Sequence, residues 1–180
     1  GVFMRFETNS VEETRAVAKQ LAQQFKAGDV ICLSGDLGAG KTAFVSGFVK
    51  AFSFEGYVSS PTFALIHEYP ANVPIYHFDM YRVSGWEDLY STGFFDYLAA
   101  GGILACEWSE NIEAVIPEIC IIVSITKTEN FTERKIEIIG DVFYLNGQNI
   151  KIKGVNHHDT TPDDGWTMTQ DEILLDLLLM

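Results

Sequence analysis

GDLGAGKT, residues 35–42, fits the pattern G-x-x-x-x-G-K-[ST] of a phosphate-binding P-loop. An apolar run suited to a buried parallel strand precedes it at residues 29–34, and apolar residues at helical spacing follow it at 43–52. When a strand, a glycine-rich loop and a helix follow one another, the glycines let backbone N–H groups face a phosphate. The N-terminus of the helix adds a positive electrostatic potential that favours the anion. We therefore expect Lys41 to reach the β- and γ-phosphates of a nucleotide and the Thr42 hydroxyl to ligate Mg²⁺.

Length and charge limit the possible functions. The 180 residues suffice for a domain with a real core, and 47% hydrophobic residues favour a globular chain over a disordered one. A net charge of −13 argues against a direct grip on a nucleic-acid backbone and favours protein partners. Three cysteines without paired spacing are typical of reduced thiols in a cytoplasmic protein, and no apolar run is long enough to span a membrane.

Strands alternate with helices around the P-loop, which predicts a three-layer α/β sandwich with a mainly parallel sheet. A Ser10–Glu13 capping box predicts a helix that runs to about Lys26. The last two strands suggest a hairpin and an antiparallel edge. Strands are expected at residues 4–7, 29–34, 63–69, 74–79, 102–107, 119–126 and 133–139, and further helices at 43–52, 85–100 with a break at Gly93, and 110–115.

A P-loop enzyme also needs a carboxylate on the metal side, usually at the end of an apolar strand. Glu107 ends the run 103–106, and Asp79 ends the run 75–78. Ligands gather at the carboxyl ends of strands in an α/β sheet, so both are expected to face one nucleotide. Each could instead be an ordinary solvated acid, and the pattern leaves open which of the two positions an attacking water.

Other candidate residues have either a functional or a purely structural interpretation. Ser-Pro-Thr at residues 60–62 suits either a loop that senses a γ-phosphate or a plain turn. Arg134 suits stacking on a base, pairing with phosphate, or a surface ion pair. Trp108 is most simply a core residue, and His67 and His77 lie within strands, where packing is the simplest role.

GDLGAGKT at 35–42, Ser-Pro-Thr at 60–62, YHFDMYR at 76–82 and Glu-Trp at 107–108 occur in the order and spacing of the TsaE family. The chain resembles these bacterial ATPases, required for threonylcarbamoyladenosine modification of tRNA, over about residues 4–140. The resemblance implies a P-loop NTPase fold, ATP/ADP and Mg²⁺ as cofactors, and weak ATPase activity. It also implies TsaD and TsaB as partners, with tRNA reached only through that complex.

The resemblance also implies a set of site residues. Lys41, Thr62, Asp79 and Glu107 are assigned to catalysis, and Thr42 and Glu107 to the metal. Ala43 stands where a second threonine is common in the family, which removes one side-chain hydroxyl. Nucleotide contacts are implied for Asn9, Ser10, Gly38, Ala39, Gly40, Lys41, Thr42, Ala43, Trp108 and Arg134.

Residues from about 143 to 180 resemble a different family, the retaining β-galactosidases at the entry to their catalytic barrel. Retaining glycosidases need two carboxyl groups about 5 Å apart, and in that family both come from later in the barrel. We therefore expect no glycosidase activity, and we divide the chain into a P-loop ATPase domain at 4–140 and a fused β-galactosidase-like fragment at 141–180. The fragment predicts a hairpin of 143–145 against 150–152, which could extend a sheet edge, and a final apolar helix.

Three functions stay open at this point. The first is an accessory ATPase for tRNA modification, and the second is a nucleotide-bound scaffold that regulates a partner without catalysis. The third is a small-molecule kinase, which lacks support because the sequence has no Arg-rich lid and no recognisable acceptor pocket.

Overall fold

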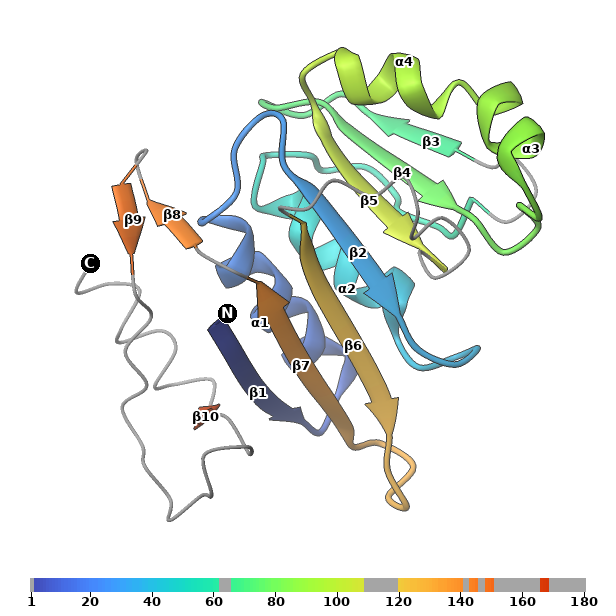
Figure 1. Cartoon of the computed structure of the whole chain (residues 1–180). Coiled ribbons are helices and arrows are strands. Elements are labelled where there is room, and N and C mark those ends of the chain that lie inside the picture. Colours follow the sequence, from blue (N-terminus) through green and yellow to red (C-terminus); the bar gives the residue numbers. More distant parts are fainter. Residues whose placement is uncertain are drawn as a thin grey trace.

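The computed structural model describes residues 2–61, 66–108 and 120–140, followed by three short strands of the C-terminal segment (Figure 1). One eight-stranded sheet has the order β10-β1-β7-β6-β2-β5-β4-β3. The elements are β1 (Val2–Thr8), α1 (Val11–Ala22), β2 (Val30–Ser34), α2 (Lys41–Lys50), β3 (Ile66–Tyr69), β4 (Ile75–Asp79), α3 (Trp86–Ser91), α4 (Phe94–Ala99), β5 (Ile103–Glu107), β6 (Ile121–Lys127), β7 (Arg134–Gly140), β8 (Phe143–Leu145), β9 (Gln148–Ile150) and β10 (Trp166–Met168).

The centre of the sheet is parallel and its flanks are antiparallel. β2 pairs in parallel with both β5 and β6, and β4 continues the parallel set beside β5. β7 turns back against β6, β1 runs antiparallel to β7, and β3 pairs antiparallel with β4. The predicted mixed α/β sheet with a mostly parallel core is therefore confirmed, and the carboxyl ends of β2, β4 and β5 meet at one edge.

Two cores lie on opposite faces of this sheet. Helices α1 and α2 cover one face and α3 and α4 the other (Figure 1). Successive residues of β2 alternate between them: Ile31 and Leu33 join the α1–α2 core, whereas Val30 and Cys32 join the α3–α4 core. None of the helices in the described ranges is long and apolar enough to cross a membrane.

Two helix boundaries differ from expectation. The first helix ends at Ala22 rather than near Lys26, because the N–H groups of residues 24 and 25 turn back to carbonyls only three residues earlier. The Asp29 carboxylate then accepts the Lys26 N–H at 2.8 Å and closes the turn before β2. The second helix starts at Lys41, two residues earlier than expected, because Gly40 caps it with φ +117°.

The segment 85–100 forms two helices as expected, and Gly93 at φ +80° starts the second one. The capping box is also present, since the Ser10 hydroxyl accepts the Glu13 N–H at 3.1 Å. Glu13 reaches back one residue further than a standard box, to the N–H of Asn9. The helix expected at 110–115 lies outside the described residues.

The strands of the C-terminal segment pair differently from the prediction. β8 and β9 form a separate two-stranded hairpin, in which 143–145 pair with 148–150 rather than with 150–152. The sequence left open that this hairpin extends a sheet edge; in the structure β10 pairs with the edge strand β1 instead, in parallel register with residues 4–6. A two-residue connection forces close pairing of the strands on either side of it, which explains the register. The predicted final helix lies outside the described residues.

Candidate functional site

The loop from β2 to α2 owes its shape to its glycines. A Cβ on Gly35 would lie 2.5 Å from the carbonyl oxygen of Ile125, so only glycine lets this loop approach β6 so closely. Gly38 and Gly40 have φ of +76° and +117°, a region that other residues rarely adopt. Nothing lies within 4 Å of a Cβ placed on Gly40, so the backbone at the start of α2 is open to a ligand.

Lys41 is almost fully buried, and its ammonium group is held at the mouth of this loop. Its Nζ donates to the carbonyl oxygens of Gly35 and, at 3.3 Å, Asp36. The same Nζ lies 4.0 Å from the centre of the Trp108 ring. Trp108 has φ of +57°, a conformation that costs about 1 kcal/mol or more outside glycine and that is often found at functional sites.

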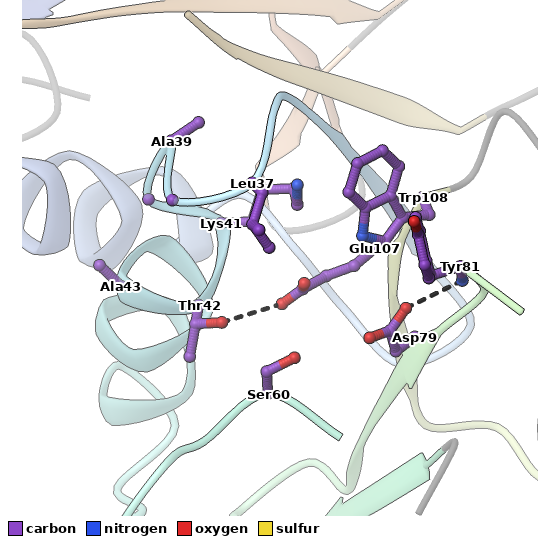
Figure 2. Close-up of a pocket in the computed structure, with 12 residues that line it drawn as sticks. Leu37, Ala39, Lys41, Thr42, Ala43, Ser60, Asp79, Tyr81, Glu107 and Trp108 are labelled. Carbon is purple, nitrogen blue, oxygen red and sulfur yellow. Dashed lines mark hydrogen bonds between the residues drawn. The ribbon is translucent and has the colours of Figure 1, made fainter. Parts of the chain in front are cut away.

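Two carboxylates end neighbouring strands beside the loop (Figure 2). Asp79 of β4 and Glu107 of β5 are register partners, and both are buried. The Thr42 hydroxyl, at the start of α2, donates to Oε1 of Glu107 at 3.3 Å. Oδ1 of Asp79 accepts the Tyr81 N–H at 2.9 Å. Both carboxylates line the same cavity, and the roles assigned to them stay predictions.

These groups line one cavity of about 440 Å³, which is within the range of ligand pockets. Thr42 and Glu107 offer it two oxygen ligands. In the described part of the chain, no cluster of three or more His, Cys, Asp or Glu side chains could bind a metal by itself. Two oxygen donors of this kind fit Mg²⁺, which usually takes one or two protein oxygens and completes its shell from phosphates and water. The lining residues are Leu37, Gly38, Ala39, Gly40, Lys41, Thr42, Ala43, Ser60, Asp79, Tyr81, Glu107 and Trp108.

A second pocket of about 190 Å³ adjoins the other side of the same loop. It shares Ala43 and the loop backbone at 38–40 with the first pocket, and adds Ser10, Phe131 and Arg134. The glycine-rich loop from β2 to α2 thus separates a polar cavity with carboxylates from a smaller pocket with an exposed aromatic ring. This arrangement suits a ligand that has a charged chain at one end and a ring system at the other.

Arg134, at the start of β7, forms hydrogen bonds that hold the loop between β2 and α2. Its Nε donates to the Ala39 carbonyl at 2.9 Å, and its Nη1 donates to the carbonyls of Phe131 and Glu133, each at 2.8 Å. The surface ion pair weighed from the sequence does not describe these contacts, because their acceptors are backbone carbonyls. The guanidinium positions the P-loop and lines the smaller pocket.

A chain of buried hydrogen bonds leads away from Glu107. Its Oε1 lies 2.8 Å from Nε2 of His77, whose Nδ1 lies 3.3 Å from the Tyr69 hydroxyl. That hydroxyl is also 3.3 Å from the carbonyl oxygen of Ser59, and Nδ1 of His67 is 3.1 Å from the same carbonyl. Burial raises the pKa of Tyr69 to about 12, so its phenol remains protonated at neutral pH.

The structure places most of the residues predicted from the sequence at the two pockets. Ser60 lines the larger one, whereas Thr62 lies outside the described residues. Asn9 lines neither of the two described pockets, and its N–H donates to the Glu13 carboxylate. Trp108 is more than a core residue, and the histidines interpreted as packing residues also make polar contacts.

Sequence reasoning missed Leu37 and Tyr81 in the lining, and it missed the link between His77 and Glu107. One available signal was strand alternation, which puts His77 on the same face as Asp79, two residues later.

The fold and the loop define a class, because the architecture is consistent with a P-loop-type α/β protein. The chain matches the family described as "Threonylcarbamoyl adenosine biosynthesis protein TsaE" over residues 8–136. It therefore belongs to the TsaE family. A match to "Glycosyl hydrolases family 2, TIM barrel domain" covers residues 136–180, so the segment is similar to a fragment of those enzymes.

Individual relatives agree with the family assignment. The tRNA threonylcarbamoyladenosine biosynthesis protein TsaE of Rickettsia conorii is 43% identical over 124 residues, covering 68% of this chain and 70% of the relative. The protein of the same name from Bacillus subtilis is 43% identical over 117 residues, covering 64% and 72%. The crystal structure of Bacillus subtilis YdiB superposes with a TM-score of 0.65 at 34% identity, covering 77% of this chain and 85% of that one.

Proposed function

We propose that this chain binds ATP and ADP with Mg²⁺ and hydrolyses ATP weakly, as an accessory ATPase for threonylcarbamoyladenosine modification of tRNA in the cytoplasm. The observation that carries the proposal is the contact between Thr42 and Glu107 beside the P-loop, in a cavity that shares loop residues with a second pocket. Homologues named for threonylcarbamoyladenosine biosynthesis support the pathway.

The two pockets suit the two ends of a nucleotide. The phosphates would lie in the larger cavity at the start of α2, where backbone N–H groups and Lys41 favour negative charge. The base and ribose would extend past residues 38–40 toward Ser10, Phe131 and Arg134. The exposed ring of Phe131 offers the base an apolar surface.

Each charged residue then has a distinct role. Lys41 would exchange the carbonyls of Gly35 and Asp36 for phosphate oxygens. Thr42 and Glu107 would hold Mg²⁺, which neutralises charge on the phosphates when it is bound. Asp79 is positioned to accept a hydrogen bond from a water in the cavity, and either carboxylate could orient the attacking water.

Partners enter the proposal through the pathway and through charge. We propose that the chain works with TsaD and TsaB and meets tRNA only within that complex. Its charge of −13 opposes direct association with a phosphate backbone. A partner protein that supplies positive charge would bring this chain and tRNA together.

A hydrolysis assay tests the activity. ATP turnover is measured for the chain alone, with TsaD and TsaB, and with tRNA added. We expect slow turnover that rises with the protein partners and does not rise with tRNA alone. Nucleotide binding without turnover under every condition would instead favour the regulatory scaffold.

A cellular assay tests the pathway. Cells depleted of their own TsaE would be supplied with this chain, and the modified adenosine next to the anticodon would be measured by mass spectrometry. We expect the modification to return with the wild-type chain and to stay absent with Lys41→Ala. Failure of the stably expressed wild-type chain to restore it would contradict the proposed pathway.

A further inference from the structure

Glu107 is a buried carboxylate that requires a partner. Only 3% of its surface is exposed, and an unpaired carboxylate in such surroundings would carry a large desolvation penalty. The neighbouring strand supplies that partner, since Nε2 of the fully buried His77 lies 2.8 Å from Oε1 of Glu107. This contact is shorter than the 3.3 Å contact from Thr42 to the same oxygen.

The sheet register explains how the two residues meet. β4 and β5 are parallel neighbours, and Asp79 lies opposite Glu107 in the register. His77 precedes Asp79 by two residues and so projects from the same face of the sheet, the face that carries α2. The imidazole therefore reaches the Glu107 carboxylate from the strand, whereas Thr42 reaches it from the helix.

Contacts at both ring nitrogens orient the imidazole of His77. A carboxylate oxygen accepts, so Nε2 carries the hydrogen that points to Glu107. At the other side of the ring, Nδ1 lies 3.3 Å from the oxygen of the Tyr69 hydroxyl, whose own hydrogen points to the Ser59 carbonyl. Tyr69 thus holds the ring in the orientation in which Nε2–H meets Glu107.

We propose that His77 is a positioning residue that fixes the Glu107 carboxylate for Mg²⁺, and that Tyr69 fixes His77. The proposal rests on the proposed function, which assigns Glu107 to the metal. A hydrogen bond to one carboxylate oxygen limits rotation of the group before the metal arrives. Outer partners of this kind typically change metal affinity by about 10- to 100-fold.

The same network extends to the loop that lines the cavity. The Tyr69 hydroxyl and Nδ1 of His67 both approach the carbonyl oxygen of Ser59, at 3.3 and 3.1 Å. Ser60, the next residue, lines the cavity. His77 and Tyr69 therefore connect the carboxylate assigned to the metal with the backbone that carries Ser60.

Two substitutions at residue 77 separate positioning from packing. An asparagine amide reaches about as far as Nδ1 of histidine, whereas a glutamine amide reaches about as far as Nε2. His77→Gln therefore keeps a donor for Glu107, and His77→Asn loses it. Tyr69→Phe removes only a hydroxyl, keeps the ring in the core, and serves as a second variant if His77→Asn fails to fold.

The experiment measures metal and nucleotide affinity separately in the full-length chain. Mn²⁺ is titrated into the ADP complex and followed by electron paramagnetic resonance, and ADP affinity is measured by calorimetry in EDTA. We expect His77→Asn to weaken Mn²⁺ binding about 10- to 100-fold. His77→Gln should stay close to the wild type and Tyr69→Phe should fall between them, while all four proteins bind ADP equally in EDTA.

The possible failures differ from one another. Wild-type Mn²⁺ affinity in His77→Asn and Tyr69→Phe would overturn the positioning role and leave the proposed function intact. Equal losses in the Asn and Gln variants that follow their melting temperatures would assign His77 to packing and also overturn the inference. A wild-type chain that binds ADP but no Mn²⁺ would overturn the metal assignment and this inference together.

Discussion

Lys41 shows how a residue is held ready for a ligand. Its buried ammonium is satisfied by two carbonyls of its own loop and by the Trp108 ring, so it avoids the cost of an unpaired buried charge. Binding of an anion would exchange neutral acceptors for charged ones, which make stronger hydrogen bonds. The strained backbone of Trp108 keeps the indole beside this ammonium.

We expect Lys41→Ala to weaken ADP binding about 10- to 100-fold, because a hydrogen bond to a charged group contributes about 1.5–3 kcal/mol. Calorimetric titration in the presence of Mg²⁺ measures the effect. Lys50→Ala, at the exposed end of the same helix, is the matched control and should bind as the wild type does. Unchanged binding and turnover in Lys41→Ala would refute the phosphate assignment.

Glu107 and Asp79 are assigned different roles although they are register partners. We expect Glu107→Ala to remove most of the Mg²⁺-dependent hydrolysis, because it takes away one of the two protein oxygens assigned to the metal. Asp79→Ala should lower turnover with a smaller effect on ADP affinity, because Asp79 is assigned to water. Steady-state kinetics over a range of Mg²⁺ concentrations distinguish the two. Full Mg²⁺-dependent turnover in Glu107→Ala would show that the metal assignment is wrong.

At the scale of elements, helices α1 and α2 pack through a glycine. A Cβ on Gly47 of α2 would lie 2.2 Å from the carbonyl oxygen of Arg15 in α1, which is closer than any real contact. α2 also carries Lys41 and Thr42 at its first turn. Close helix packing at Gly47 therefore helps to fix where the P-loop lies against the sheet.

Gly47→Ala should destabilise the fold by about 1–3 kcal/mol, the usual cost of an extra group in a packed core. Alanine favours a helix by about 1 kcal/mol over glycine, so a helix in open solvent would change in the opposite direction. Denaturation in urea measures the difference. Lys50→Ala, at the exposed end of the same helix, is the control and should change stability by less than about 0.5 kcal/mol. A gain in stability for Gly47→Ala would contradict the close contact.

At the scale of the whole molecule, charge is unevenly distributed along the sequence. Residues 141–180 hold seven acidic and two basic side chains, so five of the thirteen net negative charges belong to this segment. The remaining eight still make residues 1–140 acidic. Both parts therefore repel a phosphate backbone.

We predict that the isolated chain binds tRNA no more tightly than about 10⁻⁴ M at physiological salt, the weak end of non-specific association. A mobility-shift titration over several salt concentrations tests this expectation. Truncation after Gly140 serves as the control, because the shorter chain remains acidic and should behave alike. Tight binding that weakens steeply with salt would reveal a basic surface that the net charge conceals.

The C-terminal segment adds one edge strand, β10, to the main sheet. β10 pairs only with residues 4–6 of β1, at the opposite end of the sheet from β4 and β5. We predict that truncation after Gly140 leaves nucleotide affinity unchanged, because none of the residues beyond 140 that the structure describes lines either pocket. It should also reduce self-association, because residues 173–180 are almost entirely apolar.

Calorimetry, thermal melting and light scattering of the truncated chain test this prediction. A fall of a few degrees in melting temperature is expected from the loss of β10. Loss of nucleotide binding, or a collapse in melting temperature, would show that the segment is an integral part of the domain. Internal deletion of residues 143–150, which removes only the separate hairpin, is the matched control.

The sequence by itself determined the local parts of the site. The P-loop, the Ser10 cap and the strands that end at Asp79 and Glu107 are patterns of neighbouring residues, so each could be predicted. The parallel pairing of the central strands could also be predicted, because strands that alternate with helices favour it. The end of α1 could not be placed, because it depends on a local choice between three- and four-residue hydrogen bonds.

Tertiary structure alone decided which distant residues meet. His77 looks like a packing residue until β4 pairs with β5 and brings it to Glu107. Arg134 has no evident partner until β7 lies close enough for it to reach the carbonyl of Ala39. The physical reason is that side-chain alternation shows which face a residue occupies, whereas its partner across the sheet depends on strand order and register, which local periodicity does not specify.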